Sequence, residues 1–516
     1  MNTTSHWLKT ARLPKFPALD GQATVDVAII GGGITGITTA YLAKKAGLKV
    51  ALLERRRCAG VDTGHTTGHL TAVTDLRLHA MQRRFGRPAA RLVWEAGMAA
   101  IAKIEALADA EAIDCEFRRC PGYLHAPARH QSGTELEREL AAAQQLGIDA
   151  VFAAETPFRQ LPGVLFTRQA IFHPAKYLAG LLRAIPGAGS HVFEETAAGE
   201  IDGRTVHTPA GRVRFKHLVL ATHNPLIGDS SLLGATLFQT KLSLYTSYAL
   251  GARIPSGLIK EGAYWDTADP YHYLRVQQGE GHDYAIHGGE DHKTGQEADT
   301  VAAYARLEKH LRSFAPNAEI DARWSGQVIE TSDGLPFIGE TSERQFIATG
   351  FSGNGLTFGT VAALMAVDAC TGTENPWQKL FSPGRKKLRG GALTYISEAT
   401  DSTLRLICDR LSPAEASSLR AVAPGEGRVV QLEKQKVAAY RDEQGRLALC
   451  SAICPHLRGV VAWNPAERTW DCPCHGSRFQ TDGGVISGPA EDPLPRLSPA
   501  TLKPRRVRRA AVLSSP

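Results

Sequence analysis

The most constraining feature of this 516-residue chain is a glycine-rich turn between two short apolar runs near its start. The run VDVAII (25–30) is typical of a buried strand, GGGITG follows it, and residues 37–47 have helical apolar spacing. A second apolar run, LKVALLE, ends at Glu54. A strand, a tight turn, a helix and a second strand in this order predict a parallel βαβ unit.

The turn carries a G-x-G-x-x-G pattern at Gly31, Gly33 and Gly36, which in this context predicts a dinucleotide site. Gly31 allows the tight turn, Gly33 lets the backbone approach a pyrophosphate, and Gly36 lets the helix pack on the strand. Glu54, 23 residues after Gly31, is placed to accept hydrogen bonds from an adenosine ribose, and an acid there disfavours a 2′-phosphate. A glycine-rich turn without a ligand is the alternative, and it leaves this context unexplained.

Two later stretches extend the expected cofactor site. The stretch VRFKHLVLATHNP (213–225) predicts a strand that runs into Ala221 and Thr222. An apolar run at 346–348 then meets a turn with glycines at positions 350, 353, 355 and 359, followed by an apolar helix. Such a turn lets backbone amides and a helix N-terminus face an isoalloxazine ring or its ribityl chain.

Residues 25 to about 370 resemble the D-amino-acid-oxidase-like flavoproteins, a family that includes glycine oxidase, sarcosine oxidase and dimethylglycine dehydrogenase. The matching pieces are GGGITG, Glu54, ATHNP, RWSGQ, DGLPFIG and ATGFSGNGLTFG. The resemblance implies FAD, a parallel-sheet cofactor domain and an inserted substrate domain with a mixed or antiparallel sheet. A second G-x-G-x-x-G for NAD(P)H is absent from the sequence. The implied FAD contacts are Gly31, Gly33, Gly36, Glu54, Arg55, His65, Thr66, Ala221, Thr222, Asp333, Gly353, Asn354, Gly355 and Thr357.

The segment DTGHTTGHLT (62–71) follows the second strand, where this family lays a loop along the flavin. The resemblance places His65 where dimethylglycine dehydrogenase-like proteins carry a histidine bonded covalently to FAD. A non-covalent, hydrogen-bonding His65 is the alternative, and it is the one we favour.

The substrate region is expected between the cofactor pieces. The stretches 263–276 and 284–296 predict strands with aromatic and charged faces. In flavin amine oxidation the cofactor carries the chemistry and the protein positions the substrate. Tyr273, Arg275 and His292 are candidate substrate contacts, although each is equally an ordinary packing or surface residue. None of them identifies the substrate.

A second motif lies near the end of the chain, where Cys454, His456, Cys472 and His475 form a C-x-H and a C-x-x-H pair. Two thiolates and two imidazoles suit a structural zinc ion. They also suit a Rieske [2Fe–2S] centre, in which two cysteines hold one iron and two histidines the other. Residues 413–510, with the loops CPHL and CPCHGS and the Gly488–Pro489 pair, resemble Rieske domains, which favours the iron–sulfur cluster.

Two departures from respiratory Rieske proteins bear on redox properties. Those proteins carry one further cysteine in each loop, joined as a disulfide; here Cys474 is present but its expected partner is Gly459. The tyrosine that donates a hydrogen bond to a cluster thiolate is Phe479 here, whereas Ser477 remains. Hydrogen bonds to sulfur raise the potential, so we expect a midpoint in the lower or middle part of the roughly −150 to +300 mV Rieske range.

The D-x-x-H-x-x-x-H spacing in 62–71 also suggests a mononuclear iron site, as in Rieske ring-hydroxylating oxygenases. That spacing is one residue shorter than the usual pattern of those enzymes. Their Rieske domain also comes first, whereas here it comes last. The flavin fold already accounts for this segment, so we set the iron site aside.

Composition and charge limit the other possibilities. No apolar run approaches the length of a transmembrane helix, and the N-terminus does not have the pattern of a secretory signal. The nine cysteines are scattered apart from the last four, which suits a reducing compartment. The net charge of +7 is mild, and the basic tail KPRRVRR lacks a nucleic-acid-binding motif, so we expect a cytoplasmic protein that binds no nucleic acid and has no transmembrane segment.

The expected architecture is an α/β FAD-binding domain with an inserted α+β substrate domain, followed by a small all-β Rieske domain whose DEQG turn joins two strands. The expected boundaries are 1–375 for the oxidoreductase, 376–412 for a linker and 413–516 for the Rieske domain. We expect a dehydrogenase-like enzyme that takes a hydride from a small amine or amino acid onto FAD. Single electrons would leave through the cluster to a carrier protein or a quinone-like acceptor. The alternative is a redox partner or sensor without small-molecule turnover.

Overall fold

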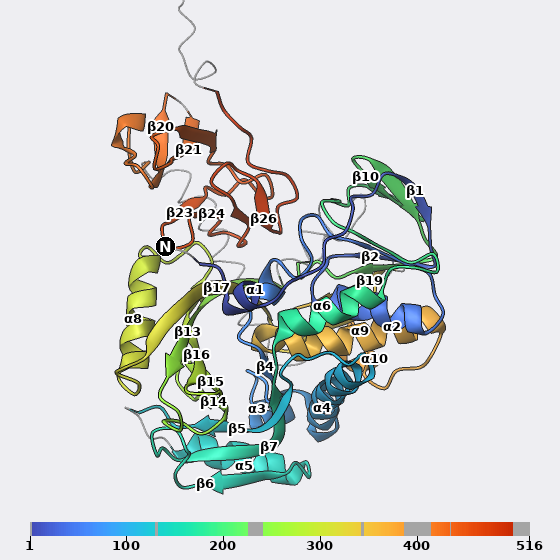
Figure 1. Ribbon diagram of the computed structural model, residues 1–516, viewed down its shortest axis with the longest axis vertical. Coiled ribbons are helices and arrows are strands. Elements are labelled where there is room, and N and C mark those ends of the chain that lie inside the picture. The colour runs from blue at the N-terminus through green and yellow to red at the C-terminus, as the bar shows by residue number, and fades with distance from the viewer. Residues whose placement is uncertain are drawn as a thin grey trace, which may run out of the picture. The chain divides into compact units, whose positions relative to one another are not determined.

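The computed structural model describes residues 3–128, 133–224, 241–341, 345–385, 414–433 and 435–498. The chain divides into two compact units, residues 1–402 and 403–516 (Figure 1). Residues 386–412 of the expected linker lie outside the described residues.

The cofactor sheet of the first unit has six strands within the described residues, in the order β18-β19-β12-β2-β3-β8. Neighbouring strands are parallel except β18 and β19. This arrangement confirms the expected βαβ unit and the strands before Ala221 and at 346–348. The strands are β2 (Val27–Ile30), β3 (Val50–Leu53), β8 (His191–Phe193), β12 (His217–Leu220), β18 (Phe337–Glu340) and β19 (Gln345–Thr349).

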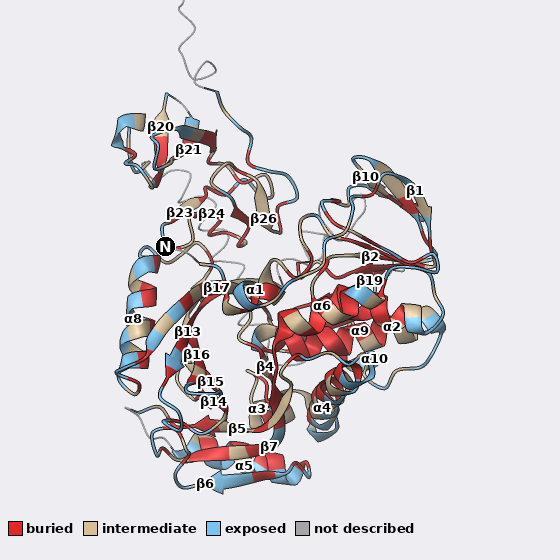
Figure 2. Cartoon of the chain, viewed as in Figure 1, coloured by how far each residue is buried: buried red, intermediate tan, exposed pale blue. Residues whose placement is uncertain are grey.

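Helices cover this sheet because their apolar residues need burial. The helix α9 (Gly355–Thr371) is apolar on nearly all sides and is buried along most of its length (Figure 2), as expected of a helix inside a core. It packs against α2 (Ile34–Lys45) and α4 (Arg87–Ala110), and α2 also packs against α6 (Pro174–Ala184). A Cβ at Gly359 would lie 2.8 Å from Ile34 Cγ2, so this glycine permits the close approach of α9 to α2.

A second, mixed sheet forms the inserted domain, with the order β17-β13-β16-β15-β14-β5-β7-β4 and β6 paired with β7. Within this sheet, β14 and β5 are the only neighbouring strands of the described residues that pair in parallel. The two stretches expected as strands appear here as β14, β15 and β16. The strands are β4 (His69–Leu70), β5 (Arg118–His125), β6 (Ala150–Ala153), β7 (Gly163–Ile171), β13 (Leu242–Ile254), β14 (Gly262–Asp266), β15 (Tyr273–Gln277), β16 (Asp283–Lys293) and β17 (Glu319–Thr331).

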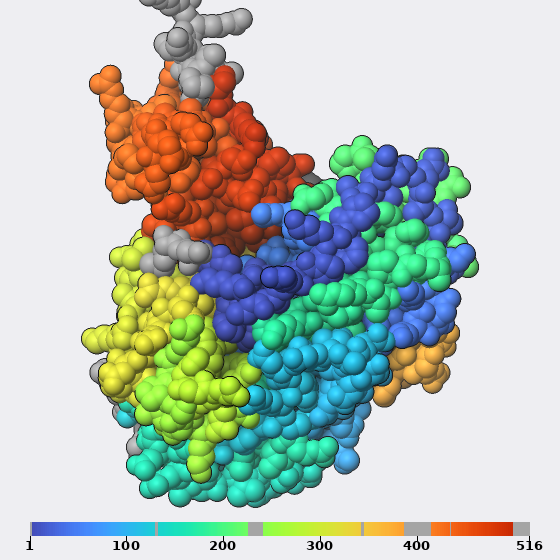
Figure 3. Space-filling model, viewed as in Figure 1, coloured from blue at the N-terminus to red at the C-terminus, as the bar shows by residue number. Residues whose placement is uncertain are grey.

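Smaller elements complete the first unit. The helix α8 (Thr300–Arg312) packs on β13 and β16, and α3 (Leu78–Phe85) packs between α4 and α5 (Gly133–Gln145). The short helix α1 (His6–Thr10) lies against α6, and the N-terminal segment runs over the face seen in Figure 3. A small sheet has the order β1-β11-β10-β9. Its strands are β1 (Gly21–Thr24), β9 (Ile201–Asp202), β10 (Thr205–Thr208) and β11 (Gly211–Arg214).

The first unit continues past residue 375, where a linker was expected to begin. The helix α10 (Gln378–Phe381) buries Phe381 completely. Arg385 then donates two hydrogen bonds to Asp333, at 2.8 and 2.7 Å, and its guanidinium lies 3.9 Å from the Phe337 ring centroid. Residues 376–385 are therefore packed on the oxidoreductase unit.

The second unit is built from two small sheets, β20-β21-β22 and β23-β24-β25-β26. The expected hairpin is present, because β21 and β22 pair antiparallel on either side of the DEQG turn. The strands are β20 (Gly427–Leu432), β21 (Gln435–Arg441), β22 (Leu447–Ser451), β23 (Ala462–Asn464), β24 (Thr469–Asp471), β25 (Arg478–Phe479) and β26 (Val485–Ser487). Trp470, Phe479 and Leu494 centre its core. In neither unit do the described helices include one with the length and apolar character needed to span a bilayer.

Candidate functional site

The turn between β2 and α2 is a cradle that only glycine fits. Gly31 has φ +109°, and a Cβ on it would lie 2.5 Å from the carbonyl oxygen of Ala221. A Cβ on Gly36 would lie 1.9 Å from the carbonyl oxygen of Gly31. The turn, the helix start and the end of β12 therefore meet at backbone distance. This is the closeness that a bound pyrophosphate requires.

The N-terminus of α2 is open to an acceptor, since its N-cap residue Gly33 supplies no side-chain capping bond. Thr63 lies at this helix end, where its Oγ1 accepts a hydrogen bond from the Ile34 amide at 3.2 Å. The sequence prediction did not include Thr63. The only sequence feature that pointed to Thr63 was its position in the loop after β3, a loop that the resembling family places beside the cofactor.

Glu54 ends β3 beside this turn. Its carboxylate accepts hydrogen bonds from the amides of Gly32 and Arg56, both at 2.8 Å. Burial raises the pKa of Glu54 although these two amides oppose the shift. Arg55, the next residue, is exposed. The pair of an acid and a glycine turn at the ends of two parallel strands fits the ribose and pyrophosphate of FAD.

His65 and Thr66 lie at the end of a 3₁₀ turn, η1 (Asp62–His65). The His65 Nδ1 is 2.7 Å from the carbonyl oxygen of Val61, and the Thr66 carbonyl accepts hydrogen bonds from the indole N–H groups of Trp7 (2.6 Å) and Trp324 (3.2 Å). The loop after β3 is thus held by Trp7 and Trp324, two residues that are far from each other in the sequence.

Asp62 joins this loop to the segment after β12. Its carboxylate lies 2.8 Å from His223 Nδ1 and accepts a hydrogen bond from the Gln327 amide at 3.2 Å. Burial opposes ionisation of Asp62, but His223 and the Gln327 amide outweigh it and hold the pKa of Asp62 below its usual value. Thr222, one residue before His223, donates its hydroxyl to the Asn224 carbonyl at 3.1 Å.

Several predicted FAD residues have structural partners in the chain. Asn354 Nδ2 donates to the carbonyls of Thr71 and Val73, at 3.2 and 2.9 Å, and Thr357 Oγ1 donates to the Thr71 carbonyl at 3.0 Å. Asp333 holds the turn before β18 through Arg385. These side chains position the segments around the cofactor turn. That Asn354, Thr357 and Asp333 also contact FAD stays a prediction.

The three candidate substrate residues have different surroundings. Tyr273 on β15 bonds its hydroxyl to Ser247 Oγ at 2.7 Å, and its ring lies 5.9 Å from that of His69. Arg275 is buried and donates to the carbonyls of Gly68 (3.0 Å) and Phe172 (2.8 Å). Arg275 therefore holds the backbone and has no exposed charge to offer a substrate.

His292, the third candidate, packs on the α8 side of the sheet. Its ring lies 5.5 Å from that of Tyr248, which in turn contacts Tyr304 of α8 at 4.6 Å. Tyr273 alone among the three lies with the polar groups near the glycine-rich turn of α9. Those further groups were not predicted: they are His69, Asp75, Ser247, Tyr271 and Asp291.

The four predicted cluster ligands of the second unit lie as two like pairs. The thiols of Cys454 and Cys472 lie close enough for each to shift the pKa of the other, and the rings of His456 and His475 lie edge to face with centroids 5.1 Å apart. Burial lowers the pKa of both histidines to about 4, which keeps them in the neutral form that binds metal. Within the described residues, no three His, Cys, Asp or Glu side chains surround a single point as ligands of one ion.

Backbone hydrogen bonds shape the two cluster loops. The Cys454 amide donates to the Gly459 carbonyl and the Cys472 amide to the Ser477 carbonyl, both at 2.8 Å. A Cβ at Gly459 would lie 2.6 Å from Cys474 Sγ and 3.2 Å from Cys472 Sγ. Gly459 therefore occupies the place opposite Cys474 that the resemblance implied, and Cys474 forms no disulfide with another described residue. The paired thiols and paired imidazoles fit a two-iron cluster.

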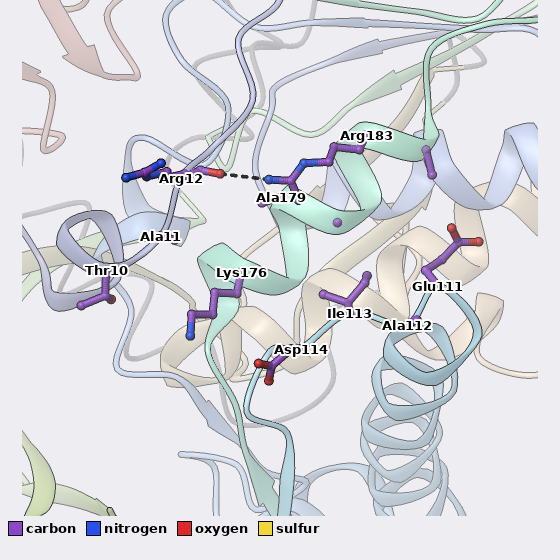
Figure 4. A pocket seen from close by; sticks show the side chains of 12 residues that line it. Thr10, Ala11, Arg12, Glu111, Ala112, Ile113, Asp114, Lys176, Ala179 and Arg183 are labelled. Atoms are coloured by element: carbon purple, nitrogen blue, oxygen red, sulfur yellow. Dashed lines mark hydrogen bonds between the residues drawn. The ribbon is translucent and has the colours of Figure 1, made fainter.

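A hollow of about 510 Å³ lies elsewhere, between the N-terminal segment, the end of α4 and α6 (Figure 4). Arg12, Lys176 and Arg183 line it together with Glu111 and Asp114. Arg183 donates to the Arg12 carbonyl at 3.3 Å, as the dashed line in Figure 4 shows. None of the predicted cofactor or substrate residues lines this hollow.

Two family models match the chain. The FAD dependent oxidoreductase model matches residues 26–369, and the Rieske [2Fe-2S] domain model matches residues 413–498. The chain is 35% identical over 502 residues to the putative Rieske 2Fe-2S iron-sulfur protein YhfW of Bacillus subtilis, covering 96% of this chain and 97% of that protein.

Relatives of the first unit alone also occur. The chain is 24% identical over 391 residues to the gamma-glutamylputrescine oxidoreductase of Escherichia coli, covering 72% of this chain and 89% of that protein. The crystal structure of glycine oxidase from Geobacillus kaustophilus superimposes with a TM-score of 0.58 at 19% identity, covering 71% of this chain and all of that one. At this identity the likeness is one of fold.

Proposed function

This chain belongs to the FAD dependent oxidoreductase family and carries a Rieske [2Fe-2S] domain, and we propose that it takes electrons from a small amine or amino acid. When bound, FAD supplies acceptance of a hydride, and the cluster supplies one-electron transfer. The observation that carries the proposal is that one polypeptide holds both a glycine cradle beside Glu54 and a pair of thiols beside a pair of imidazoles.

The residues of this chain hold the cofactors and position the substrate. Gly31, Gly36 and the N-terminus of α2 would bind the pyrophosphate, and Glu54 the adenosine ribose. Cys454 and Cys472 would hold one iron, and His456 and His475 the other. Tyr273, fixed by Ser247, is the candidate that would orient the substrate.

The substrate class is supported by the named relatives. One is called an oxidoreductase of gamma-glutamylputrescine, an amine, and solved structures of the same fold include glycine oxidase and L-amino acid deaminase. We propose that the acceptor is an external one-electron carrier protein or a quinone-like molecule. A redox partner or sensor without turnover is the competing proposal.

The first experiment is to mix the full-length holoprotein anaerobically with a panel of amines and amino acids and to follow flavin bleaching. At least one compound should bleach the flavin and then allow a one-electron dye to be reduced. If no compound bleaches the flavin, the sensor alternative is favoured and turnover is rejected.

The second experiment separates the cluster from the flavin. The His475→Ala variant should still bleach its flavin with substrate but lose most of its one-electron dye reduction, because the cluster lacks a ligand. His282→Ala, an exposed histidine of the first unit, is the matched control. Unchanged dye reduction in a folded His475→Ala protein that binds FAD, or fast release of hydrogen peroxide with an undisturbed cluster, would contradict the relay.

A further inference from the structure

Strand β16 has a bulge beside the polar cluster that lies near the glycine-rich turn of α9. This cluster consists of His69, Asp75, Ser247, Tyr271, Tyr273 and Asp291. The register between β13 and β16 shifts between Thr246 and Tyr248, so that Glu290 and Asp291 together oppose the single residue Ser247. Glu290 has φ +60°, which is uncommon for a residue with a side chain. Bulges redirect side chains and are frequent next to active sites. Here the bulge sends Glu290 toward Arg306 of α8, at 2.6 Å, and Asp291 toward Ser247.

Asp291 is a half-buried residue whose carboxyl group has one buried, unused oxygen. Its Oδ1 is buried and has no hydrogen-bond partner among the described residues. Ser247, whose hydroxyl bonds to that of Tyr273, lies beside the Asp291 carboxyl group. Burial raises the pKa of Asp291 to about 7, and the nearby carboxylate of Asp75 adds to the rise. An unsatisfied buried acceptor is costly unless a ligand completes it.

Asp75 brings a second carboxylate to the same place. Its Oδ1 accepts a hydrogen bond from the Tyr271 hydroxyl at 3.1 Å, and its Oδ2 accepts one from the Gly353 amide at 2.7 Å. A Cβ on Gly353 would lie 2.8 Å from the Tyr271 hydroxyl. The two carboxyl groups thus adjoin the glycine-rich turn before α9, which is the turn expected to face the flavin.

The cations near this cluster are already engaged. Arg77 lies 4.0 Å from Glu135 and donates to the Asp266 carbonyl, and His272 lies 3.6 Å from Asp266. Arg275 is bound to backbone carbonyls, and Arg323 of β17 pairs with Glu308 at 2.6 Å. Within the described residues, the cluster therefore presents negative charge without a cation to receive a substrate carboxylate.

We propose that Asp291, with Asp75 beside it, binds a positively charged nitrogen of the substrate, so that the substrate is a diamine-type compound and not an amino acid held by its carboxylate. The inference rests on the proposed function, because it names the substrate class of the same site. One amino group would be oxidised while the second, as an ammonium, would donate to Asp291. A carboxylate in its place would be repelled by both acids.

The test titrates the full-length holoprotein with 1,4-diaminobutane, n-butylamine or butyrate and follows the visible absorption of the flavin. We expect 1,4-diaminobutane to bind at least about tenfold more tightly than n-butylamine, since one charge-assisted hydrogen bond is lost in the latter. Asp291→Asn should remove that difference, whereas the control Asp202→Asn, at an exposed residue of β9, should keep it. Retention of FAD and an unchanged Tm show that each variant is folded.

The pH dependence gives a second readout. Because the free carboxyl must ionise to bind a cation, 1,4-diaminobutane affinity should fall about tenfold per pH unit below 7 in the wild type but not in Asp291→Asn. Equal binding of 1,4-diaminobutane by wild type and Asp291→Asn, absent binding, or tighter binding of butyrate overturns this inference. Binding and flavin bleaching are measured separately. If amines bleach the flavin but Asp291→Asn does not change diamine binding, only this inference is rejected. If diamine binding depends on Asp291 but no amine bleaches the flavin, only the proposed amine oxidation is rejected.

Discussion

At the scale of single residues, Phe479 and Ser477 set the surroundings of the cluster thiols. Phe479 is fully buried in β25, and Ser477 is buried beside the Cys454 thiol and accepts a hydrogen bond from the Ala490 amide at 2.9 Å. One of the two hydroxyl donors of respiratory Rieske proteins is therefore replaced by an apolar ring, and the other is retained.

This difference leads to a prediction about the midpoint potential. Phe479→Tyr should raise the potential by adding a donor to a thiolate, and Ser477→Ala should lower it by removing one. Spectroelectrochemical titration of the holoprotein measures both. A wild-type midpoint near the top of the roughly −150 to +300 mV range, or shifts with the opposite signs, would contradict the argument.

The attachment of FAD is also decided at one residue. The Nδ1 of His65 is engaged by the Val61 carbonyl within the 3₁₀ turn. We expect acid denaturation to release the FAD and leave a colourless pellet, measured by absorbance of the supernatant. A yellow pellet that becomes colourless in His65→Ala would establish a covalent bond there. A yellow pellet lost only in His69→Ala would move the bond to His69, whose Nε2 is buried without a partner among the described residues.

At the scale of elements, β15, β16 and α8 enclose three histidines. His287 Nε2 lies 3.1 Å from His310 Nδ1, and the ring of His272 lies 4.2 Å from that of His310. Burial, with the neighbouring histidines, lowers the pKa of His310 to about 4 and that of His287 well below its usual value. These groups stay neutral in the folded chain at pH values where the unfolded chain protonates them.

The consequence is acid sensitivity with a defined sign. The unfolded state binds more protons below pH 6.5, so the free energy of unfolding should fall as pH drops from 6.5 toward 4. A histidine that stays neutral contributes up to about 1.4 kcal/mol per pH unit. His287→Gln should flatten this limb, and the exposed control His282→Gln should not, by urea unfolding at stepped pH. An unchanged slope in His287→Gln would refute the assignment.

At the scale of the whole molecule, two carriers of different electron capacity share one chain. The first unit fits FAD and the second fits a two-iron cluster, and the relative YhfW matches nearly the full length of both. In the route proposed above, an electron pair accepted by the first unit leaves one electron at a time through the second.

This pairing predicts the electron capacity of the chain. Anaerobic dithionite titration should consume about three electrons per chain, two for the flavin and one for the cluster. His475→Ala should consume about two, since it lacks a cluster ligand. Wild-type uptake of about two electrons, with zinc and no iron or sulfide in the metal analysis, would contradict the Rieske assignment.

The sequence alone determined the motifs whose members are close along the chain. The glycine turn of β2 and α2, Glu54 at the end of β3, and the C-x-H and C-x-x-H pairs follow from local spacing, because a few intervening residues restrict where their groups can lie. The same reasoning predicted the β21–β22 hairpin and the strand before Ala221.

Only the tertiary structure revealed which polar groups come together at the proposed substrate site. Arg275 was a reasonable substrate contact by sequence, but strand pairing places its guanidinium against the carbonyls of Gly68 and Phe172. Asp75 and Asp291 come from segments more than two hundred residues apart, and the bulge in β16 that re-aims Asp291 is set by its register with β13. Register and bulges arise from packing between distant strands, and a local pattern does not contain that information.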